Sequence, residues 1–350
     1  MLVTLDSVSV LLVWTAIAVY ALAFIAYAVD LARRGELAVE AKDLAEARDR
    51  ELVGAAAGAS GSSLRDASLA RMKAEQAAAD AAVEAAPRDR QRHLWARIGT
   101  SLTVLAFGFH LGGTITRGIA SGRVPWSNMY EFALMGTLLI VAVYLIVLFR
   151  YDLRFLGALI TGMVVLLLGG ATLGFYVEIV PLADPLKSIW LVIHVFVASL
   201  ATALFALAFG LSVLQLMQAR RERKALATDA GAGAVKSGLR FLRTLPTAEK
   251  LESLAYRFAI LGFIFWTFTL IAGSIWANDA WGRYWGFDTK EVWTFVIWVL
   301  YAGYIHARAT RGWRGSRSAW LSIIGFAAVM FNFTIVNMFF KGLHVYSGLS

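Results

Sequence analysis

The residues most suited to chemistry lie in one short segment, residues 276–293, which reads WANDAWGRYWGFDTKEVW. Tryptophans often anchor membrane helices at the lipid headgroups, but that role accounts for only one or two of those present here. A flat aromatic platform could instead stack on a planar hydrophobic ligand, while Arg283 and Lys290 meet its carboxylates. The segment combines the acidic residues Asp288 and Glu291 with four tryptophans, namely Trp276, Trp281, Trp285 and Trp293.

Two of the five histidines are expected on the same side of a membrane as this aromatic segment. His194 lies near the start of an apolar stretch, and His344 follows the last apolar stretch, in the run KGLH. A lone histidine in a membrane helix is often only a packed or hydrogen-bonded residue. Two of them beside a tryptophan-rich loop favour metal ligation, because two neutral imidazoles can bind haem iron from its two faces.

The other histidines differ in depth. His306 lies 16 residues past Lys290, which is about 24 Å deeper along a helix. It is either a second ligand or a residue of the inner interface. We expect His110 to be structural or accessory, with direct ligation as the alternative, and His93 to be solvated within the basic run RDRQRH.

The composition tells us which elements must position these side chains. Apolar residues make up 59% of the chain and charged residues only 16%, and the mean hydropathy is +0.64. These values exclude an ordinary soluble enzyme and predict an all-α polytopic membrane protein. The sequence has no cysteine, so disulfides, zinc–thiolate sites, iron–sulfur clusters and thiol catalysis are excluded for this chain.

Eight stretches are long and apolar enough to predict spanning helices. The first is too long for a signal peptide, and no basic residue precedes it, so we expect it to be retained. The predicted spans are about 10–32, 96–117, 128–149, 153–176, 188–217, 254–276, 291–308 and 319–340.

The distribution of lysine and arginine predicts the orientation. If the N-terminus is outside, 27 of the 33 basic residues fall in inner segments. The positive-inside rule therefore places both termini outside. The basic net charge is mainly a signal of topology, and we expect no nucleic-acid partner. The inner segments are 33–97, 150–154, 218–257 and 308–317.

Three regions follow from these patterns. Residues 1–32 form the first spanning helix, and residues 33–94 form a charged, alanine-rich cytoplasmic segment of two short helices around a break at 54–63. Residues 95–350 form a seven-helix core whose outer loop covers about 277–293.

A second outer cluster surrounds Glu131, which enters an otherwise apolar span and needs a partner there. Arg117 or Arg123 can supply the opposite charge. The alternative is local, because Ser127 and Asn128 can cap the helix together with Glu131.

The segment 281–308 resembles the tryptophan-rich WWD signature of the haem-handling proteins of cytochrome c maturation. It is most similar to the CcsA/ResC branch of the System II pathway, which actinobacteria often label CcsB. The resemblance covers about residues 95–350, whereas residues 1–94 are not diagnostic. Further matching segments are SNMYEF at 127–132, WLVIHV at 190–195, YIHAR at 304–308 and KGLH at 341–344.

The resemblance implies that His194 and His344 are the axial ligands of haem at an outer site. It implies that His306 holds haem in transit, together with a histidine of a partner subunit of the Ccs1/ResB type. It assigns no catalytic residue beyond those that position haem. The haem-binding signature would comprise Trp281, Trp285, Asp288 and Trp293.

The implied function is that of a subunit of a membrane cytochrome c synthase, or haem lyase, in the plasma membrane with an extracytoplasmic active face. It would receive haem b and present it for covalent attachment to the CxxCH motif of apocytochrome c. The alternatives are a haem transporter or chaperone without attachment chemistry, and a general transporter or structural subunit whose tryptophans are only anchors.

Two departures from the family pattern are visible. The family usually reads Trp-Asp-Pro-Lys-Glu, whereas residues 287–291 here are Phe-Asp-Thr-Lys-Glu. Phe287 keeps an aromatic face, but Thr289 does not supply the fixed turn that proline would. The family also often has a histidine where Arg123 stands here.

Overall fold

The structure, a computed structural model, describes residues 4–58, 94–229, 239–310, 313–340 and 342–343. Within these ranges every regular element is helical. The short elements are the 3₁₀ helices η1 (Arg154–Leu156), η2 (Asp184–Lys187) and η3 (Arg240–Thr244), the π-helix η4 (Asn332–Val336) and the three-residue α10 (Asn337–Phe339). The long helices are α1 (Leu5–Gly58), α3 (Leu94–Ser121), α4 (Met129–Leu148), α5 (Gly157–Gly174), α6 (Ile189–Asp229), α7 (Ala248–Trp281), α8 (Thr289–Ala309) and α9 (Ser316–Phe331).

Each of the eight predicted spans corresponds to one of these long helices. In the described part of the chain, seven helical stretches are long and apolar enough to cross a membrane by length and composition. The remaining helix is α8, which is less apolar because it carries polar and charged residues at both ends, such as Lys290 and Arg308. The protein is therefore a polytopic all-α membrane protein, as the sequence predicts.

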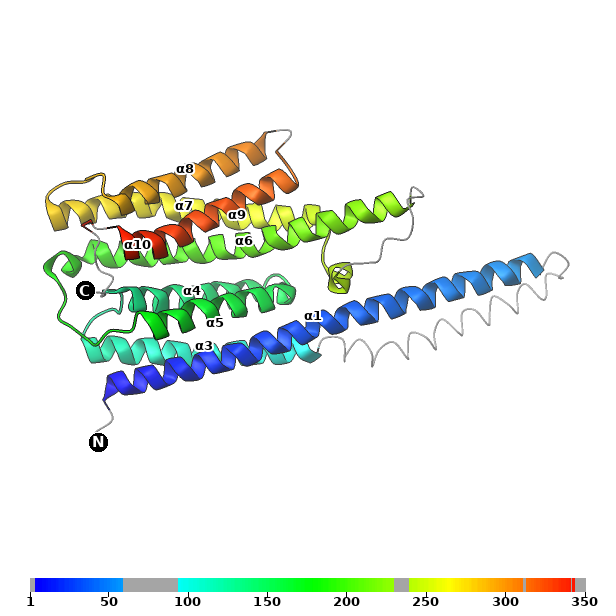
Figure 1. Cartoon of the computed structure of the whole chain (residues 1–350), viewed down its shortest axis with the longest axis horizontal. Helices are drawn as coiled ribbons and strands as arrows, with labels where there is room; N and C mark the ends of the chain where they lie inside the picture. Colours follow the sequence, from blue (N-terminus) through cyan, green and yellow to red (C-terminus); the bar gives the residue numbers. More distant parts are fainter. Residues whose placement is uncertain (1–3, 59–93, 230–238, 311–312, 341, 344–350) are drawn as a thin grey trace.

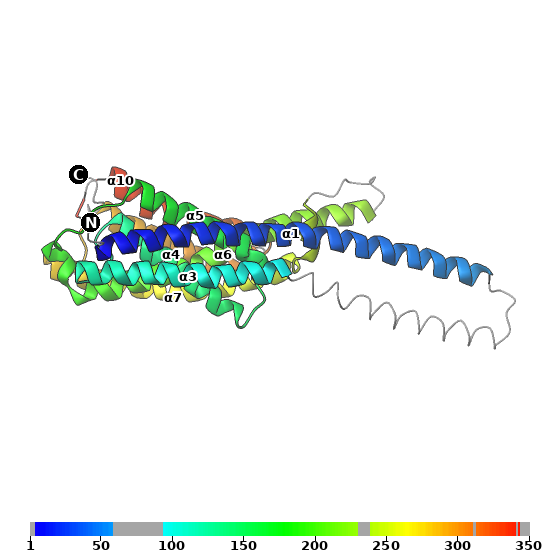
Figure 2. The same ribbon diagram turned by 90° about the horizontal axis from the view of Figure 1, so that it is seen from below.

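The first helix differs from its prediction. α1 runs unbroken from Leu5 to Gly58, so the first of the two short helices expected in 33–94 is a continuation of the spanning helix. It ends at Gly58, inside the predicted break. Figures 1 and 2 show α1 projecting well beyond the other helices. Residues 59–93, where the second helix was expected, lie outside the described residues.

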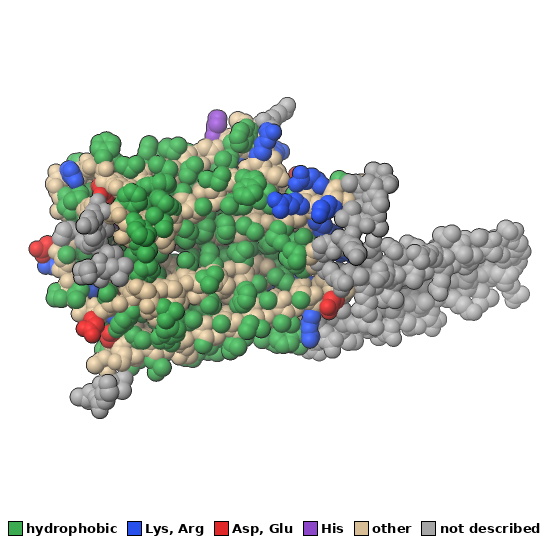
Figure 3. Space-filling view, viewed as in Figure 1, with side chains coloured by type: hydrophobic (Ala, Val, Ile, Leu, Met, Phe, Trp, Pro, Cys, Tyr) green, Lys and Arg blue, Asp and Glu red, His purple; other side chains and the backbone are tan. Residues whose placement is uncertain are grey.

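The long helices alternate in direction, so the connections gather at two ends of the bundle (Figure 1). We call one the tryptophan end; it comprises the start of α1, residues 122–128, 175–188 and 282–288, and α10. We call the other the basic end; it comprises residues 149–153, 239–247 and 313–315. Apolar side chains cover most of the surface between the two ends, and Lys and Arg gather toward the basic end (Figure 3).

The bundle consists of two halves. In the first half, α1, α3, α4 and α5 pack together. In the second half, α6 packs along α7 and α9. The contact between α4 and α6 joins the two halves. The second half packs closely because Gly262 leaves room for Phe205, whose ring would be 2.6 Å from a Cβ at that position. Phe205 in turn stacks on Tyr301, with ring centroids 3.6 Å apart. This packing fixes α6, α7 and α8 around the site described next.

Candidate functional site

The ring of His194 is held by one face of α7. Its Nδ1 lies 2.9 Å from the backbone carbonyl oxygen of Thr269, and its plane stacks on Trp276, with centroids 5.8 Å apart. A carbonyl oxygen only accepts, so Nδ1 carries the proton and Nε2 is the nitrogen with a lone pair. This backbone contact is the usual way in which a protein orients a metal-binding imidazole.

Two cavities meet at His194. The larger, about 180 Å³, lies at the seam between α4 and α6 and is also lined by residues of α7, α8, α9, η4 and α10. The smaller, about 70 Å³, lies between α7 and the tryptophan-rich loop, where Tyr284 and Trp285 line it. His194, Thr269, Trp276, Lys290 and Thr294 line both. The imidazole is therefore placed where a ligand can occupy both cavities at once.

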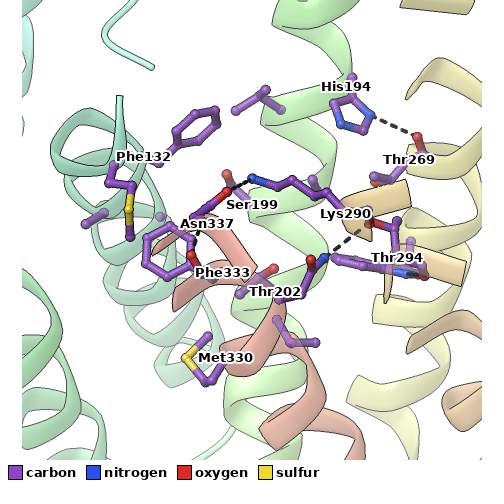
Figure 4. Close-up of a pocket in the computed structure, with 18 of the residues that line it drawn as sticks. Phe132, His194, Ser199, Thr202, Thr269, Lys290, Thr294, Met330, Phe333 and Asn337 are labelled. Atoms are coloured by element: carbon purple, nitrogen blue, oxygen red, sulfur yellow. Dashed lines mark hydrogen bonds between the residues drawn. The ribbon is translucent and has the colours of Figure 1, made fainter. Parts of the chain in front are cut away.

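Lys290 extends across the larger cavity. Its Nζ donates a hydrogen bond to Oδ1 of Asn337, 2.5 Å away, and lies 5.8 Å from the ring centroid of Phe132 on α4. Figure 4 shows Lys290 and Asn337 pointing toward each other, with His194 nearby on α6. The ammonium group is thus available to an anionic ligand within the helix bundle.

A π-helix forms part of the wall of the larger cavity near Lys290. Residues Asn332–Val336 make a π-turn at the end of α9, a local widening that is frequent at functional sites. Asn332 is buried, and its Nδ2 donates to Oγ1 of Thr294 at 3.3 Å. Its Oδ1 is buried and has no hydrogen-bond partner among the described residues. A polar atom in this position marks a place where a ligand group or a water can bind.

A capping box fixes the tryptophan-rich loop where it joins α8. Asp288 is the N-cap of α8, and Glu291 completes the box. Oε2 of Glu291 accepts from the backbone N–H of Gly286 at 2.8 Å and of Asp288 at 3.2 Å. Phe287, between them, has a φ of 56°, which is rare for an aromatic residue. These contacts fix the geometry of the turn, although Thr289 stands where the family usually has proline.

The structure brings some of the predicted site residues together and separates others. Trp285 lines the smaller cavity, and Trp281 packs on Trp276 with centroids 4.9 Å apart. Trp293 instead packs on Phe331, at 4.4 Å, and lines neither cavity. Arg283 is exposed, and its guanidinium lies over the backbone of Gly286.

Two other histidines of the described residues, His306 and His110, line neither cavity. His306 is exposed on α8 near the basic end, and Figure 3 shows a histidine at the edge of the surface. His110 is fully buried; Nε2 lies 2.9 Å from the carbonyl oxygen of Leu134, and Nδ1 lies 3.4 Å from the hydroxyl of Tyr20. Both ring nitrogens of His110 therefore lie within hydrogen-bond distance of groups in the protein. His93 and His344 lie outside the described residues.

Both explanations offered for Glu131 are correct. Its carboxylate pairs with Arg117 at 3.0 Å and with Arg123 at 2.7 Å, and it also accepts from the backbone N–H and hydroxyl of Ser127. Asn128 caps the helix by accepting from the backbone N–H of Glu131 at 2.9 Å. The cluster fixes the start of α4, whose residues Met129 and Phe132 line the larger cavity.

The sequence did not identify Thr269, Asn332 and Asn337 as site residues. Thr269 acts through its backbone carbonyl, which no side-chain pattern reveals. The two asparagines could have been found from the sequence, because they are polar residues within a predicted apolar span. Polar residues there are costly and often functional.

The fold and this site together define a family of membrane proteins. The profile of the cytochrome c assembly protein family matches residues 126–344, a range that includes both cavities. The chain belongs to this family and has a role in cytochrome c biogenesis.

Curated relatives narrow the type. The chain is 35% identical to the cytochrome c biogenesis protein CcsA of Guillardia theta, over 67% of this chain and 80% of the relative. It is 33% identical to CcsA of Prochlorococcus marinus, over 66% and 78%. It is 32% identical to CcsA of Microcystis aeruginosa, over 71% and 86%. The chain is therefore a CcsA-type cytochrome c biogenesis protein.

Proposed function

We propose that the protein is the haem-holding subunit of a membrane cytochrome c synthase of System II. It holds haem b at the tryptophan end with His194 and His344 as axial ligands, and presents it to the CxxCH motif of apocytochrome c. The observation that carries this proposal is the position of His194 at the junction of two cavities, where the contact of Nδ1 with the carbonyl oxygen of Thr269 makes Nε2 the nitrogen that would ligate iron.

The walls of the site suit a porphyrin. Trp276 and Trp285 supply aromatic surface beside His194, and the ammonium group of Lys290 can bind a carboxylate. Arg283 and Trp293 have less support as haem contacts, because one is exposed and the other packs on α9. Asp288 supports the site by fixing the loop, and Trp281 by packing on Trp276.

The attachment chemistry needs positioning rather than a catalytic side chain in this protein. Each cysteine thiol of the apocytochrome adds across a haem vinyl group, so that sulfur bonds to one carbon and the hydrogen goes to the other. No electrons are gained or lost overall. The protein contributes by fixing the vinyl groups within reach of the thiols. A chain with no cysteine of its own offers no competing thiol.

His306 would hold haem on its way to this site. Because it is exposed on α8, a ligand from another chain can reach it, and we propose that a membrane subunit of the Ccs1/ResB type supplies the second axial histidine. The basic end would face the cytoplasm under the positive-inside rule, so both termini and the tryptophan end would lie outside the plasma membrane.

The test is covalent haem attachment to a reporter cytochrome in cells that depend on this protein. We expect His194→Ala to abolish holocytochrome formation and to remove the haem absorption band of the purified complex. Phe196→Ala, two residues further along α6 at an exposed position, is the control and should retain both. Normal holocytochrome levels in the His194→Ala strain would refute the proposal.

A second assay separates attachment from transport alone. The purified complex is loaded with haem and mixed with a peptide containing CxxCH under reducing conditions. Thioether formation, detected by mass spectrometry, supports the synthase. Haem transfer to the peptide without a covalent bond would support a transporter or chaperone instead.

A further inference from the structure

We infer that the haem binds with its carboxylate edge in the larger cavity, at Lys290 and Asn337, and its vinyl edge toward the smaller cavity and the tryptophan-rich loop. This inference rests on the proposed function, because it orients the ligand that His194 would bind. It assigns recognition of the haem carboxylates to Lys290 and not to Arg283.

The charges of the two cavities differ. Lys290 is the one lysine, arginine or acidic residue among the described residues that line the larger cavity. Its ammonium contacts an amide oxygen and an aromatic ring, and both are neutral. Asp288, two residues earlier, attracts the ammonium electrostatically, but its carboxylate also caps α8 and accepts from the backbone N–H of Leu343. A cation within a membrane bundle is stabilised by an anionic ligand.

The amides beside Lys290 suit a carboxyl group. Asn337 holds the ammonium through Oδ1, while its Nδ2 donates to the carbonyl oxygen of Phe333. Asn332 is 6% exposed, and its Oδ1 has no partner among the described residues. A side-chain amide can present either an acceptor to a protonated carboxyl group or a donor to a carboxylate. The π-turn therefore gives the larger cavity a polar wall, where Oδ1 of Asn332 can accept from a protonated carboxyl group of the haem.

The smaller cavity disfavours carboxylates. Lys290 lines this cavity too, but its ammonium donates to Asn337, which lines the larger of the two. Glu291 lines only the smaller one, and its carboxylate would repel another. Its remaining walls include the aromatic residues Trp276, Tyr284 and Trp285, which suit the apolar vinyl edge. Tyr284 is 62% exposed, so this cavity opens where an incoming thiol can reach. Arg283 is exposed away from both cavities and is not needed for this orientation.

The experiment is a spectroscopic titration of the purified full complex with three iron porphyrins: haem, its dimethyl ester and mesohaem. The ester lacks the carboxylate charges, and mesohaem has ethyl groups in place of vinyls. Wild type should bind haem more tightly than the ester. This preference should fall by about tenfold or more in Lys290→Met, because a charged hydrogen bond is lost. The ratio of the affinities for haem and for its ester is compared between wild type and variant, so that the different solubility of the two porphyrins cancels.

Asn337→Asp is the second variant, chosen because it is nearly isosteric and keeps the acceptor for Lys290, although it loses the donor to the carbonyl oxygen of Phe333. Its carboxylate would compete with the haem for Lys290, so haem affinity should fall while ester affinity stays unchanged. Unchanged affinity for the ester shows that the site is intact. Lys187→Met is the matched control, since Lys187 is an exposed lysine of the same end, paired with Asp184. It should leave the preference at the wild-type value.

The outcomes distinguish the two proposals. If His194→Ala binds haem with an unchanged spectrum, the proposed function fails. If wild type binds haem through His194 but Lys290→Met keeps the full preference over the ester, only the orientation is overturned. Mesohaem should bind within about threefold of haem, on the scale of a weak contact. Equal affinity of the wild type for haem and its dimethyl ester would overturn the orientation, because the carboxylates would then have no charged partner.

Discussion

The imidazole of His194 lies directly against the backbone of Gly273. A Cβ at Gly273 would stand 2.7 Å from both Cε1 and Nδ1 of the ring, closer than unbonded atoms can approach. Gly273 follows Thr269 by one helical turn, and Trp276 follows by another. One face of α7 therefore provides a carbonyl for Nδ1, room for the ring and an aromatic surface for it to stack on.

This close packing of His194 against Gly273 predicts the effect of adding a methyl group at Gly273. Gly273→Ala should push the His194 ring away from Thr269 and lower haem affinity by about tenfold or more, equivalent to about 1.4 kcal/mol. Absorption titration of the purified complex measures it. Gly170→Ala on α5, where a Cβ meets nothing within 4 Å, is the control. Equal affinities for the two variants would show that the contact does not position the ring.

The ion cluster around Glu131 predicts a large loss of stability. Glu131→Gln should lower the free energy of unfolding by about 3 kcal/mol, because it leaves the fully buried Arg117 and its neighbour Arg123 with less compensating charge. Thermal unfolding in detergent measures the effect. Asp184→Asn removes an exposed acidic partner of Lys187 and should leave the midpoint unchanged. A similar midpoint for both variants would contradict the assigned role of the cluster.

The capping box predicts a difference between two substitutions at Asp288. Asparagine is a good N-cap and alanine is a poor one, so Asp288→Ala should destabilise the protein by about 1 kcal/mol and Asp288→Asn by much less. Haem binding should follow the same order if Asp288 acts by fixing the loop. Equal loss of haem binding in both variants, at unchanged thermal stability, would instead assign the carboxylate a direct contact with the ligand.

The backbone of Phe287 predicts opposite effects on stability and binding. Its φ of 56° favours glycine, so Phe287→Gly should raise the free energy of unfolding by up to about 1 kcal/mol. The ring packs edge-on against Trp285, with centroids 6.3 Å apart. Its loss should weaken haem binding by freeing Trp285. Thermal unfolding and haem titration on the same samples test both parts, and tighter binding in the variant would refute the second.

Much of the fold could be predicted because a membrane helix is specified by the composition of its own residues. Each predicted span corresponds to a helix, since twenty apolar residues in sequence are sufficient to specify one. The boundary after residue 32 was less accurate, because the helix continues through a charged but alanine-rich stretch that also favours helix. Hydropathy marks where the apolar part ends, which is a different position from the end of the helix.

The site could be predicted only in part. Trp285 and Lys290 were identified from their types and spacing, and both line a cavity with His194. Trp293 and Arg283 were predicted from the same segment on the same grounds. In the structure, however, Trp293 packs on α9 and Arg283 is exposed. The direction of a side chain depends on the rotation of its helix against neighbours that are distant in sequence, so composition alone does not reveal it.

The sequence by itself determined the membrane class, the spans, the family and the aromatic loop, because each of these depends on local runs and motifs. Only the tertiary structure decided that the carbonyl of Thr269 orients His194, that Gly273 makes room for it, and that Lys290 meets Asn337. These contacts join residues that are 47 to 79 positions apart in sequence. Packing of α6, α7, α8 and α10 brings them together, and a backbone oxygen or a missing Cβ has no sequence motif.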